Sequence, residues 1–249
     1  MNKPKALFNW SGGKDSSLCL YHVLQAGEID VSCLFTTVSA RYNRISQHGV
    51  RAELLRVQAE KTGIPLKILR LPDSPTMEEY NNRLRETLAG FREEGVTVSV
   101  FGDIALEDLR RYREEQLSKA GLKGLFPLWK QPTGKLAKEF IDLGFKAVTV
   151  CVDGSRLDRS FAGRDFDEDF LKDLPEGIDS CGENGEFHTF VYDGPVFSKS
   201  VAFARGDLVY RTYTPPDREV DGSDDYSCSA GRPESSLPGF WFCDLIPPV

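Results

Sequence analysis

The stretch that decides the fold is Ser11-Gly12-Gly13-Lys14-Asp15-Ser16, which lies between an apolar run, Lys5 to Asn9, and an amphipathic run, Ser17 to Gln25. The apolar run predicts a buried strand and the amphipathic run predicts a helix. Two adjacent glycines let the backbone approach an anion and direct successive N–H groups toward it. The N-terminus of the following helix adds partial positive charge. The sequence therefore predicts a phosphate-binding turn between the first strand and the first helix of an α/β sheet.

The side chains of this stretch, called the phosphate loop below, suit a nucleotide polyphosphate. Ser11 and Ser16 offer hydroxyl donors, Ser17 helps to open the helix, and Lys14 offers a point charge for phosphate oxygens. Phosphate alone would repel Asp15, so this residue suggests a Mg²⁺ that bridges the carboxylate and the phosphates. We expect the loop to bind phosphate through residues 11–17. Lys14 and Asp15 are expected to act in catalysis as surface side chains without a role in the core.

Strand and helix signals alternate on both sides of the first helix. Such alternation implies a doubly wound parallel sheet with helices on both faces and right-handed crossovers. Strands are predicted at 31–38, 66–71, 97–101 and 147–152, and helices at 52–61, 76–94, 106–120 and 135–143.

The second half of the chain has a different character. A stretch rich in glycine and proline, 153–185, precedes a predicted strand at 187–192, and a loop of this length is usually functional. The segments 198–204 and 208–213 predict a hairpin around Arg205-Gly206-Asp207. We expect a nucleotide-binding domain at 1–121, a smaller substrate domain at 122–214 and an acidic tail at 215–249. In that tail, the apolar cluster Phe240-Trp241-Phe242 is expected to dock on the body of the protein.

Charge is unevenly spread along the 249 residues. Lys and Arg number 31 against 38 Asp and Glu, a net charge of -7. The tail from Pro215 holds seven acids and two bases, which is -5 of that total. The nearly neutral remainder offers no basic field for nucleic acid, which makes a nucleic-acid partner an unfavoured expectation.

The chain carries no signal for a membrane or for secretion. The uncharged run Val31 to Ala40 is about half of the roughly 20 residues that a membrane helix needs. The apolar stretch after Lys5 is too short for a signal peptide. Six cysteines occur without a C-x-x-C pair, which favours reduced thiols in the core. We expect a cytoplasmic protein that does not contact membranes.

The phosphate loop resembles the SGGxDS signature of the PP-loop ATP pyrophosphatases. It is not a Walker A loop, because Lys14 is followed by Asp15 rather than by Ser or Thr. The resemblance implies cleavage of ATP between its α- and β-phosphates, with the loop holding the departing pyrophosphate. The alternative is a glycine-rich turn that binds nothing.

Further stretches resemble the diphthine–ammonia ligase family. They are Gly182 to Phe190 (GENGEFHTF), Asp193-Gly194-Pro195, Phe101-Gly102-Asp103-Ile104 and Pro127-Leu128-Trp129. The resemblance implies an adenine nucleotide α-hydrolase-like domain followed by a smaller α+β substrate domain. It also implies amidation of a carboxylate with ATP and ammonium through an acyl-adenylate. That carboxylate can belong to a protein, and a homodimer is compatible with this expectation.

Glu183, Glu186 and His188 are the second group of candidate catalytic residues. Carboxylates near an acyl-adenylate would bind ammonium, hold a second Mg²⁺ or take a proton from the attacking nitrogen. The alternative is a turn whose acids are solvated. The substrate stays open, because Asn184 and His188 stand where the family reads Gly and Glu.

Four other positions are candidates for nucleotide binding. His48, with Arg44 and Arg51 nearby, would reach the phosphates, or else it belongs to a solvated helix start. Asp103 follows a predicted strand, where doubly wound sheets place functional residues, although it would also serve as an N-cap. Gly102 and Thr36 enter through the resemblance, which implies backbone contacts to adenine beside Thr36.

These observations favour an ATP-dependent amidoligase that uses ATP, Mg²⁺ and ammonium. One alternative is another PP-loop enzyme that modifies tRNA or a small molecule. The tRNA alternative predicts a basic face and usually a catalytic cysteine pair, neither of which the sequence shows. A second alternative is a nucleotide-binding module without turnover, for which Lys14 and Asp15 would be superfluous.

Overall fold

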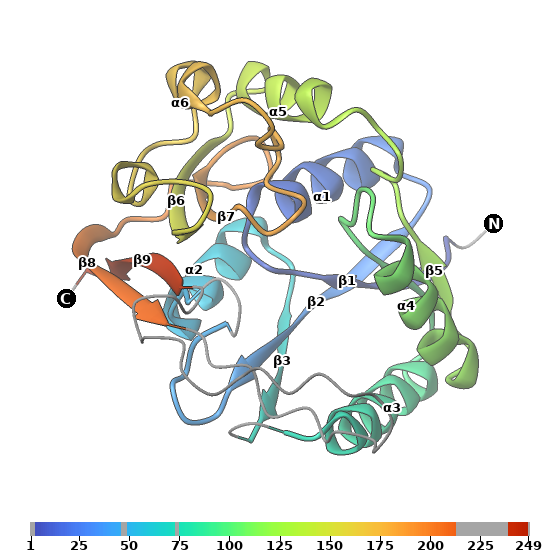
Figure 1. Cartoon of the computed structure of the whole chain (residues 1–249). Helices are drawn as coiled ribbons and strands as arrows, with labels where there is room; N and C mark the ends of the chain where they lie inside the picture. Colours follow the sequence, from blue (N-terminus) through green and yellow to red (C-terminus); the bar gives the residue numbers. More distant parts are fainter. Residues whose placement is uncertain (1–2, 46–48, 73–74, 213–238, 249) are drawn as a thin grey trace, which may run out of the picture.

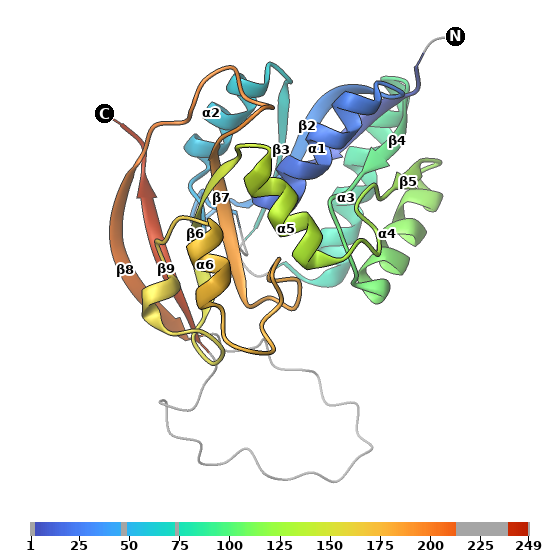
Figure 2. The same cartoon turned by 90° about the horizontal axis from the view of Figure 1, so that it is seen from above.

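The chain folds around two β-sheets that lie side by side (Figures 1 and 2). A computed structural model describes residues 3–45, 49–72, 75–212 and 239–248. The first sheet has five parallel strands in the order β3-β2-β1-β4-β5, and the second has four antiparallel strands in the order β7-β6-β9-β8. The predicted doubly wound parallel sheet, followed by an α+β unit, is therefore confirmed.

The strands and helices follow the predicted alternation closely. The first sheet comprises β1 (Lys5–Asn9), β2 (Asp30–Ser39), β3 (Leu66–Leu71), β4 (Val96–Val100) and β5 (Lys123–Leu125). The second comprises β6 (Lys146–Asp153), β7 (Phe187–Asp193), β8 (Ala204–Thr212) and β9 (Gly239–Ile246). The helices are α1 (Lys14–Ala26), α2 (Ala52–Thr62), α3 (Met77–Glu93), α4 (Glu107–Lys119), α5 (Thr133–Asp142) and α6 (Glu168–Asp173), with a 3₁₀ turn at Arg159–Phe161. Among the described residues, no helix is long and apolar enough to cross a membrane.

Strand β1 separates two hydrophobic cores. Successive side chains of a strand point to opposite faces, so Ala6 and Phe8 join one core while Leu7 joins the other. The Leu7 core contains residues of α3 and α4. The larger core contains residues of α1, α2 and α5 and continues without a break into β6 and β7. The second sheet is thus packed on the α1 and α2 side of the first.

Strand pairing differs from the expected boundaries at two places. Strand β5 pairs with β4, so the first sheet extends beyond residue 121 to Leu125. The expected hairpin around Arg205-Gly206-Asp207 is wrong, because residues 204–212 form one strand with a bulge between Arg205 and Leu208. The pairing partner is β9, which lies much further along the chain than the expected hairpin partner.

Strand β9 confirms that the cluster Phe240-Trp241-Phe242 docks on the body of the protein. It lies between β6 and β8, so a segment expected to be tail completes the second sheet. The expectation of reduced core cysteines is also confirmed for the described residues, in which Cys19, Cys33, Cys151, Cys181 and Cys243 are buried and free. Cys228 lies outside the described residues.

Candidate active site

The phosphate loop has a fixed shape that its own side chains and glycines produce. Gly12 has φ +74°, and a Cβ at this position would lie 2.4 Å from Gln58 Oε1 and 2.8 Å from Leu55 Cδ2. The hydroxyl of Ser11 donates to Ser16 Oγ (3.0 Å), which in turn donates to the Gly13 carbonyl (2.9 Å). These contacts within the protein stabilise the conformation of the loop.

Gln58 of α2 supports the loop through hydrogen bonds, a role that was not predicted. It is fully buried, and its Nε2 donates to the carbonyls of Gly12 (3.0 Å) and Val191 (2.6 Å). Its Oε1 accepts from Trp10 Nε1 (3.1 Å). A glutamine in an amphipathic helix is usually solvated, so no sequence pattern distinguishes this one.

One backbone–backbone hydrogen bond and one bond to a side-chain hydroxyl join the loop to the second sheet. Val191 N of β7 donates to the Gly12 carbonyl (2.9 Å), and Lys14 N donates to Thr189 Oγ1 (3.0 Å). Two strand residues that are far from the loop in sequence thus form one wall of it.

The position of Lys14 corrects the expectation of a surface side chain. It is 3% exposed, and its Nζ bonds to Asp15 Oδ2 (2.9 Å) and to the Cys181 carbonyl. The ammonium also lies 5.3 Å from the ring centre of Phe187. Burial acts to lower the pKa of Lys14, but Asp15 and further negative groups outweigh it, so the pKa is raised. Lys14 is therefore a charged residue at the junction of the two halves.

Other loop residues differ in exposure. Ser11 and Asp15 remain partly exposed, whereas Ser16 and Ser17 are buried. The hydroxyl of Ser17 is buried without a hydrogen-bond partner among the described residues. Ser17 is thus not placed as an open phosphate ligand, and Ser11 and Asp15 are the best exposed side chains of the loop.

Gly102 and Asp103 follow β4 and adjoin the first turn of α1. A Cβ on Gly102 would lie 3.0 Å from the Asp15 carbonyl oxygen and 3.1 Å from Ser16 Cα, so a side chain would displace that turn. Asp103 pairs with Arg113 of α4 (Oδ2 to Nε, 2.7 Å). Burial raises the pKa of Asp103, and Arg113 opposes that shift. The N-cap alternative for Asp103 is wrong, because α4 begins after Leu106.

Glu183 connects the second half of the chain to the loop after β4. Its Oε1 accepts from the backbone N–H groups of Ile104 (3.2 Å) and Ala105 (2.9 Å). Burial raises the pKa of Glu183, and the charge of Asp15 contributes to the shift. Asp15 also raises the pKa of Asp103, so the three carboxylates share one electrostatic environment.

The carboxylate of Glu186 is bonded to groups of its own turn and to Arg156. Its side chain is fully buried, and Oε1 pairs with Arg156 Nη1 (3.2 Å) and accepts from Asn184 Nδ2 (3.0 Å). Its Oε2 accepts from Asn184 N (2.9 Å). The carboxylate therefore organises the turn from Asp179 to Glu186, called the 179–186 segment below.

His188 lies on β7 next to Thr189, and neighbouring strand residues point to opposite faces. Thr189 is the residue that contacts the phosphate loop. Burial and the nearby charge of Lys14 lower the pKa of His188 to about 4, so its imidazole is neutral at pH 7. His188 is thus a neutral imidazole near enough to Lys14 for that charge to act on it.

The remaining nucleotide-binding candidates occupy β2 and the loop after it. Thr36 is buried within β2 opposite Ile68 of β3, rather than at the end of the strand. His48 lies outside the described residues. Arg44 and Arg51 pair with Asp244 of β9, at 2.8 and 2.6 Å, instead of pointing to an open phosphate site. The C-terminal strand thus fastens the β2–α2 loop.

We expect the ion pairs of Asp244 with Arg44 and Arg51 to stabilise the folded chain in a way that acid removes. The hydrogen bond from Arg51 and the charges of both arginines lower the pKa of Asp244 to about 2 from 3.8. A carboxyl group whose pKa is lower in the folded state stabilises that state at pH values above its unfolded pKa. This contribution is lost as the pH falls toward the folded-state pKa. We expect Asp244→Asn to cost at most about 2 kcal/mol at pH 7.

Urea unfolding between pH 7 and 2 measures this effect, and the difference from the unmodified chain should shrink below pH 4. Asp142→Asn is the matched control, because the side chain of Asp142 is 56% exposed and pairs at 3.6 Å. A difference between Asp244→Asn and the unmodified chain that stays constant with pH contradicts the expectation.

A Mg²⁺ at this site would need oxygens from the nucleotide. The described residues contain no group of three or more His, Cys, Asp or Glu side chains that could hold a metal ion. Mg²⁺ is commonly bound by one or two carboxylates together with substrate phosphates. The partly exposed carboxylate of Asp15 fits that requirement, so Asp15 is the residue that would hold the ion.

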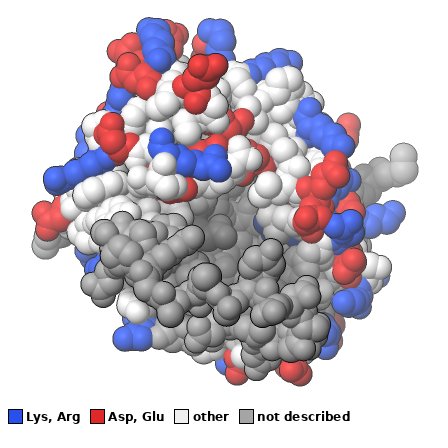
Figure 3. Space-filling model, viewed as in Figure 1, with Lys and Arg blue, Asp and Glu red and all other residues white. Residues whose placement is uncertain are grey.

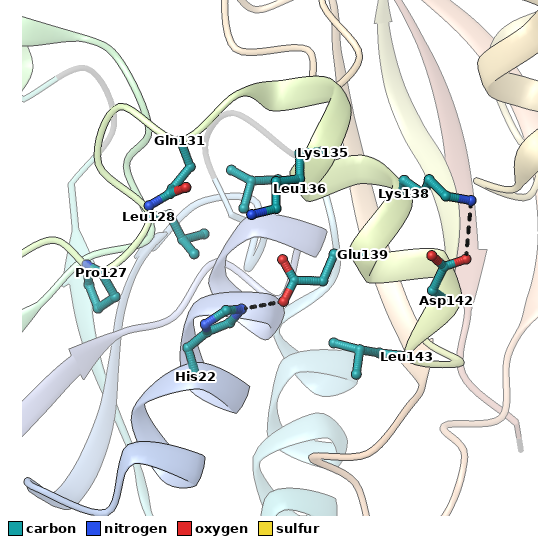
Figure 4. A pocket seen from close by; sticks show the side chains of 10 residues that line it. All are labelled: His22, Pro127, Leu128, Gln131, Lys135, Leu136, Lys138, Glu139, Asp142 and Leu143. Carbon is teal, nitrogen blue, oxygen red and sulfur yellow. Dashed lines mark ion pairs between the residues drawn. The ribbon is translucent and has the colours of Figure 1, made fainter.

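The described surface has mixed charge on the face drawn in Figure 3, and a separate pocket lies between two helices. On the described part of the face in Figure 3, basic and acidic side chains are interspersed. A pocket of about 580 Å³ between α1 and α5 contains the pair His22–Glu139, 3.0 Å apart (Figure 4). His22 is eight residues along α1 from Lys14, or about 12 Å of helix, so this pocket is not at the phosphate loop.

The parallel sheet and its loop define an α/β protein with a glycine-rich loop between β1 and α1. The chain belongs to the diphthamide synthase family: the N-terminal domain of diphthamide synthase matches residues 4–124, and the C-terminal domain matches 132–212. Strand β9 lies beyond both matched ranges.

The family's curated relatives are distant. A diphthine–ammonia ligase of Danio rerio is 27% identical over 77% of this chain and 83% of the relative. The diphthine–ammonia ligase of Homo sapiens is 26% identical over 80% of this chain and 82% of the relative. That of Schizosaccharomyces pombe is 32% identical over 80% of this chain and 36% of its own length. Among solved structures, the U34-tRNA thiolase NcsA from Methanococcus maripaludis with its [4Fe-4S] cluster is 19% identical to this chain. The match covers 58% of this chain and 59% of the thiolase, with a TM-score of 0.36.

Proposed function

We propose that this chain is an ATP-dependent ligase that converts a carboxylate to an amide with ammonium, as a diphthine–ammonia ligase does. One observation carries the proposal: the phosphate loop and the second sheet are joined by direct hydrogen bonds between Gly12 and Val191 and between Lys14 and Thr189. A nucleotide on the loop would therefore lie beside residues of the second half. Family membership supports the same conclusion.

The proposed reaction has two steps that this junction suits. A carboxylate is a poor acyl donor, so its oxygen attacks the α-phosphate of ATP, which forms an acyl-adenylate and releases pyrophosphate. Ammonia then attacks the acyl carbon, AMP leaves, and the excess protons pass to solvent. Holding both reactants together reduces the entropy cost of the second step.

Residues of the loop and of the 179–186 segment would divide the work. Ser11 and the N-terminus of α1 would hold the pyrophosphate. When bound at Asp15, Mg²⁺ would neutralise phosphate charge. Glu183 is the carboxylate best placed to attract ammonium, since it is half-buried and senses the charge of Asp15.

The products of ATP cleavage test the proposed chemistry. We expect AMP and pyrophosphate in equal amounts, with MgCl₂ required, because the loop is of the PP-loop type rather than a Walker A loop. Chromatography of the nucleotides after incubation with ATP, ammonium and a cell extract measures this. The appearance of ADP and phosphate as enzyme products would exclude the proposed reaction.

The substrate class needs a separate experiment. We propose a carboxylate carried by a protein, in keeping with the family. Pyrophosphate exchange into ATP is to be compared between the protein fraction and the small-molecule filtrate of the extract. Exchange that depends on the filtrate alone would redirect the proposal to a small-molecule carboxylate.

A further inference from the structure

Lys14 belongs to the phosphate loop by sequence, but its ammonium contacts the other half of the chain. The Nζ bonds to the Cys181 carbonyl and to Asp15 Oδ2, and it lies 5.3 and 5.8 Å from the ring centres of Phe187 and Phe166. A buried ammonium is costly unless it is paired and hydrogen-bonded. These partners meet that requirement, and ring faces also attract cations.

The Cys181 carbonyl lies within a tightly bonded turn. Asp179 Oδ1 accepts from Cys181 N (2.8 Å) and from Glu183 N (3.2 Å). The carboxylate of Glu186 holds Asn184 in the same turn. A displacement of the Cys181 carbonyl would therefore also move Glu183, the carboxylate proposed to attract ammonium.

The other end of the Lys14 contact is sensitive to a nucleotide. Asp15 is the partly exposed carboxylate of the phosphate loop, and it is the counter-ion of Lys14. A Mg²⁺–nucleotide bound at Asp15 would compete with Lys14 for this carboxylate, while its phosphate oxygens would attract the ammonium, which lies 2.9 Å from Asp15 Oδ2. A change of charge beside Lys14 would therefore alter how strongly its ammonium bonds to the Cys181 carbonyl.

We propose that Lys14 is a positioning residue that couples occupation of the phosphate loop to the 179–186 segment. This inference rests on the proposed function and extends it, because it explains how the amidation half of the site would respond to ATP. Binding of ATP would alter the Asp15–Lys14 ion pair. The hydrogen bond from Lys14 to the Cys181 carbonyl would change as a result, and with it the conformation of the turn that carries Glu183. The acceptor site would thus be formed when ATP is present.

Hydrogen exchange of the full chain tests the coupling with α,β-methylene ATP and MgCl₂, because this analogue cannot be cleaved between its α- and β-phosphates. The amides of Cys181, Glu183 and Asn184 are the reporters, since each has a defined acceptor within the segment. In the unmodified chain, saturating analogue should change their exchange rates by about tenfold, the size expected for one hydrogen bond to a charged group.

Lys14→Met keeps the length of the side chain and its contact with the rings but removes the charge. We expect this variant to bind the analogue while the response of the three amides falls below about twofold. Lys14→Arg keeps the charge and should keep a response at those amides. Lys138→Met is the matched control, since the side chain of Lys138 is 70% exposed on α5, and it should respond as the unmodified chain does.

The outcomes separate the coupling from the proposed function. A full response in Lys14→Met, or loss of analogue binding even at saturating concentration, overturns the coupling. An unmodified chain that binds the analogue without a response in the 179–186 segment also overturns it and leaves the proposed function in place. An unmodified chain that does not bind the analogue overturns both. If Lys14→Met fails to fold, Lys14→Arg decides, because a folded Arg variant that binds without a response refutes the coupling.

Discussion

Asp15→Asn should reduce formation of AMP and pyrophosphate by at least about 100-fold, the usual scale for removing one preorganised electrostatic contact in a reaction centre. The carboxylate of Asp15 is 31% exposed beside the phosphate loop, and it is the residue proposed to hold Mg²⁺. An asparagine retains an oxygen that accepts from Lys14 but lacks the charge. The loss should therefore be in turnover more than in folding.

Initial rates of pyrophosphate release and the melting temperature are to be measured on the same sample. We expect a stability loss of about 1–3 kcal/mol, because the buried ammonium of Lys14 loses its charged partner. Asp108→Asn is the matched control, since Asp108 is 93% exposed on α4. Turnover in Asp15→Asn within a few-fold of the unmodified chain would remove Asp15 from the proposed reaction centre.

The second large effect is expected for Glu186→Gln, which should destabilise the chain by about 2–4 kcal/mol. The carboxylate is fully buried, and it accepts from both nitrogens of Asn184 and pairs with Arg156. The amide NH₂ of a glutamine would face one of the N–H groups of Asn184, with which it cannot form a hydrogen bond. Arg156 would also lose the buried carboxylate with which it pairs. The 179–186 segment should lose its order, and amide formation should fall with it.

Melting temperature and the two half-reactions distinguish this role from that of a general base. A general base would leave stability unchanged and would slow amide formation alone by about 10²–10⁴-fold. Glu176→Gln serves as the control, because Glu176 is an exposed acid a few residues before the segment. An unchanged melting temperature together with selective loss of amide formation would restore Glu186 as a catalytic residue.

The sequence predicted the first sheet well because its signals are local. The apolar run of β1, the glycines of the loop and the amphipathic pattern of α1 each act within a few residues, and α1 and α2 end at Gly27 and Gly63 with φ of +64° and +73°. The edge strand β5 was harder to predict, because a strand of three residues is too short to show a hydrophobic pattern. The bulge in β8 resembled a turn, because Arg205-Gly206-Asp207 has turn composition whether or not the chain reverses.

The roles of individual site residues were less predictable from the sequence. The glycine-rich turn between β1 and α1 was predicted, and its shape includes the hydrogen bond between Ser11 and Ser16 and the position of Gly102 beside α1. Lys14 was expected at the surface and is buried, and the candidate catalytic residue Glu186 is also buried. Charged residues are rarely buried without a partner, so their positions follow from contacts that a local pattern does not contain.

The sequence by itself determined the phosphate loop, the parallel sheet and the family resemblance, since backbone preference and hydrophobic period are properties of neighbouring residues. The tertiary structure decided which side chains meet at the loop. Gln58 reaches Val191 across 133 residues, Lys14 reaches Cys181 across 167, and Arg51 reaches Asp244 across 193. Each contact exists because the two sheets pack together and bring a donor to an acceptor that is distant in sequence. Such a pairing depends on packing geometry, which one-dimensional spacing does not encode.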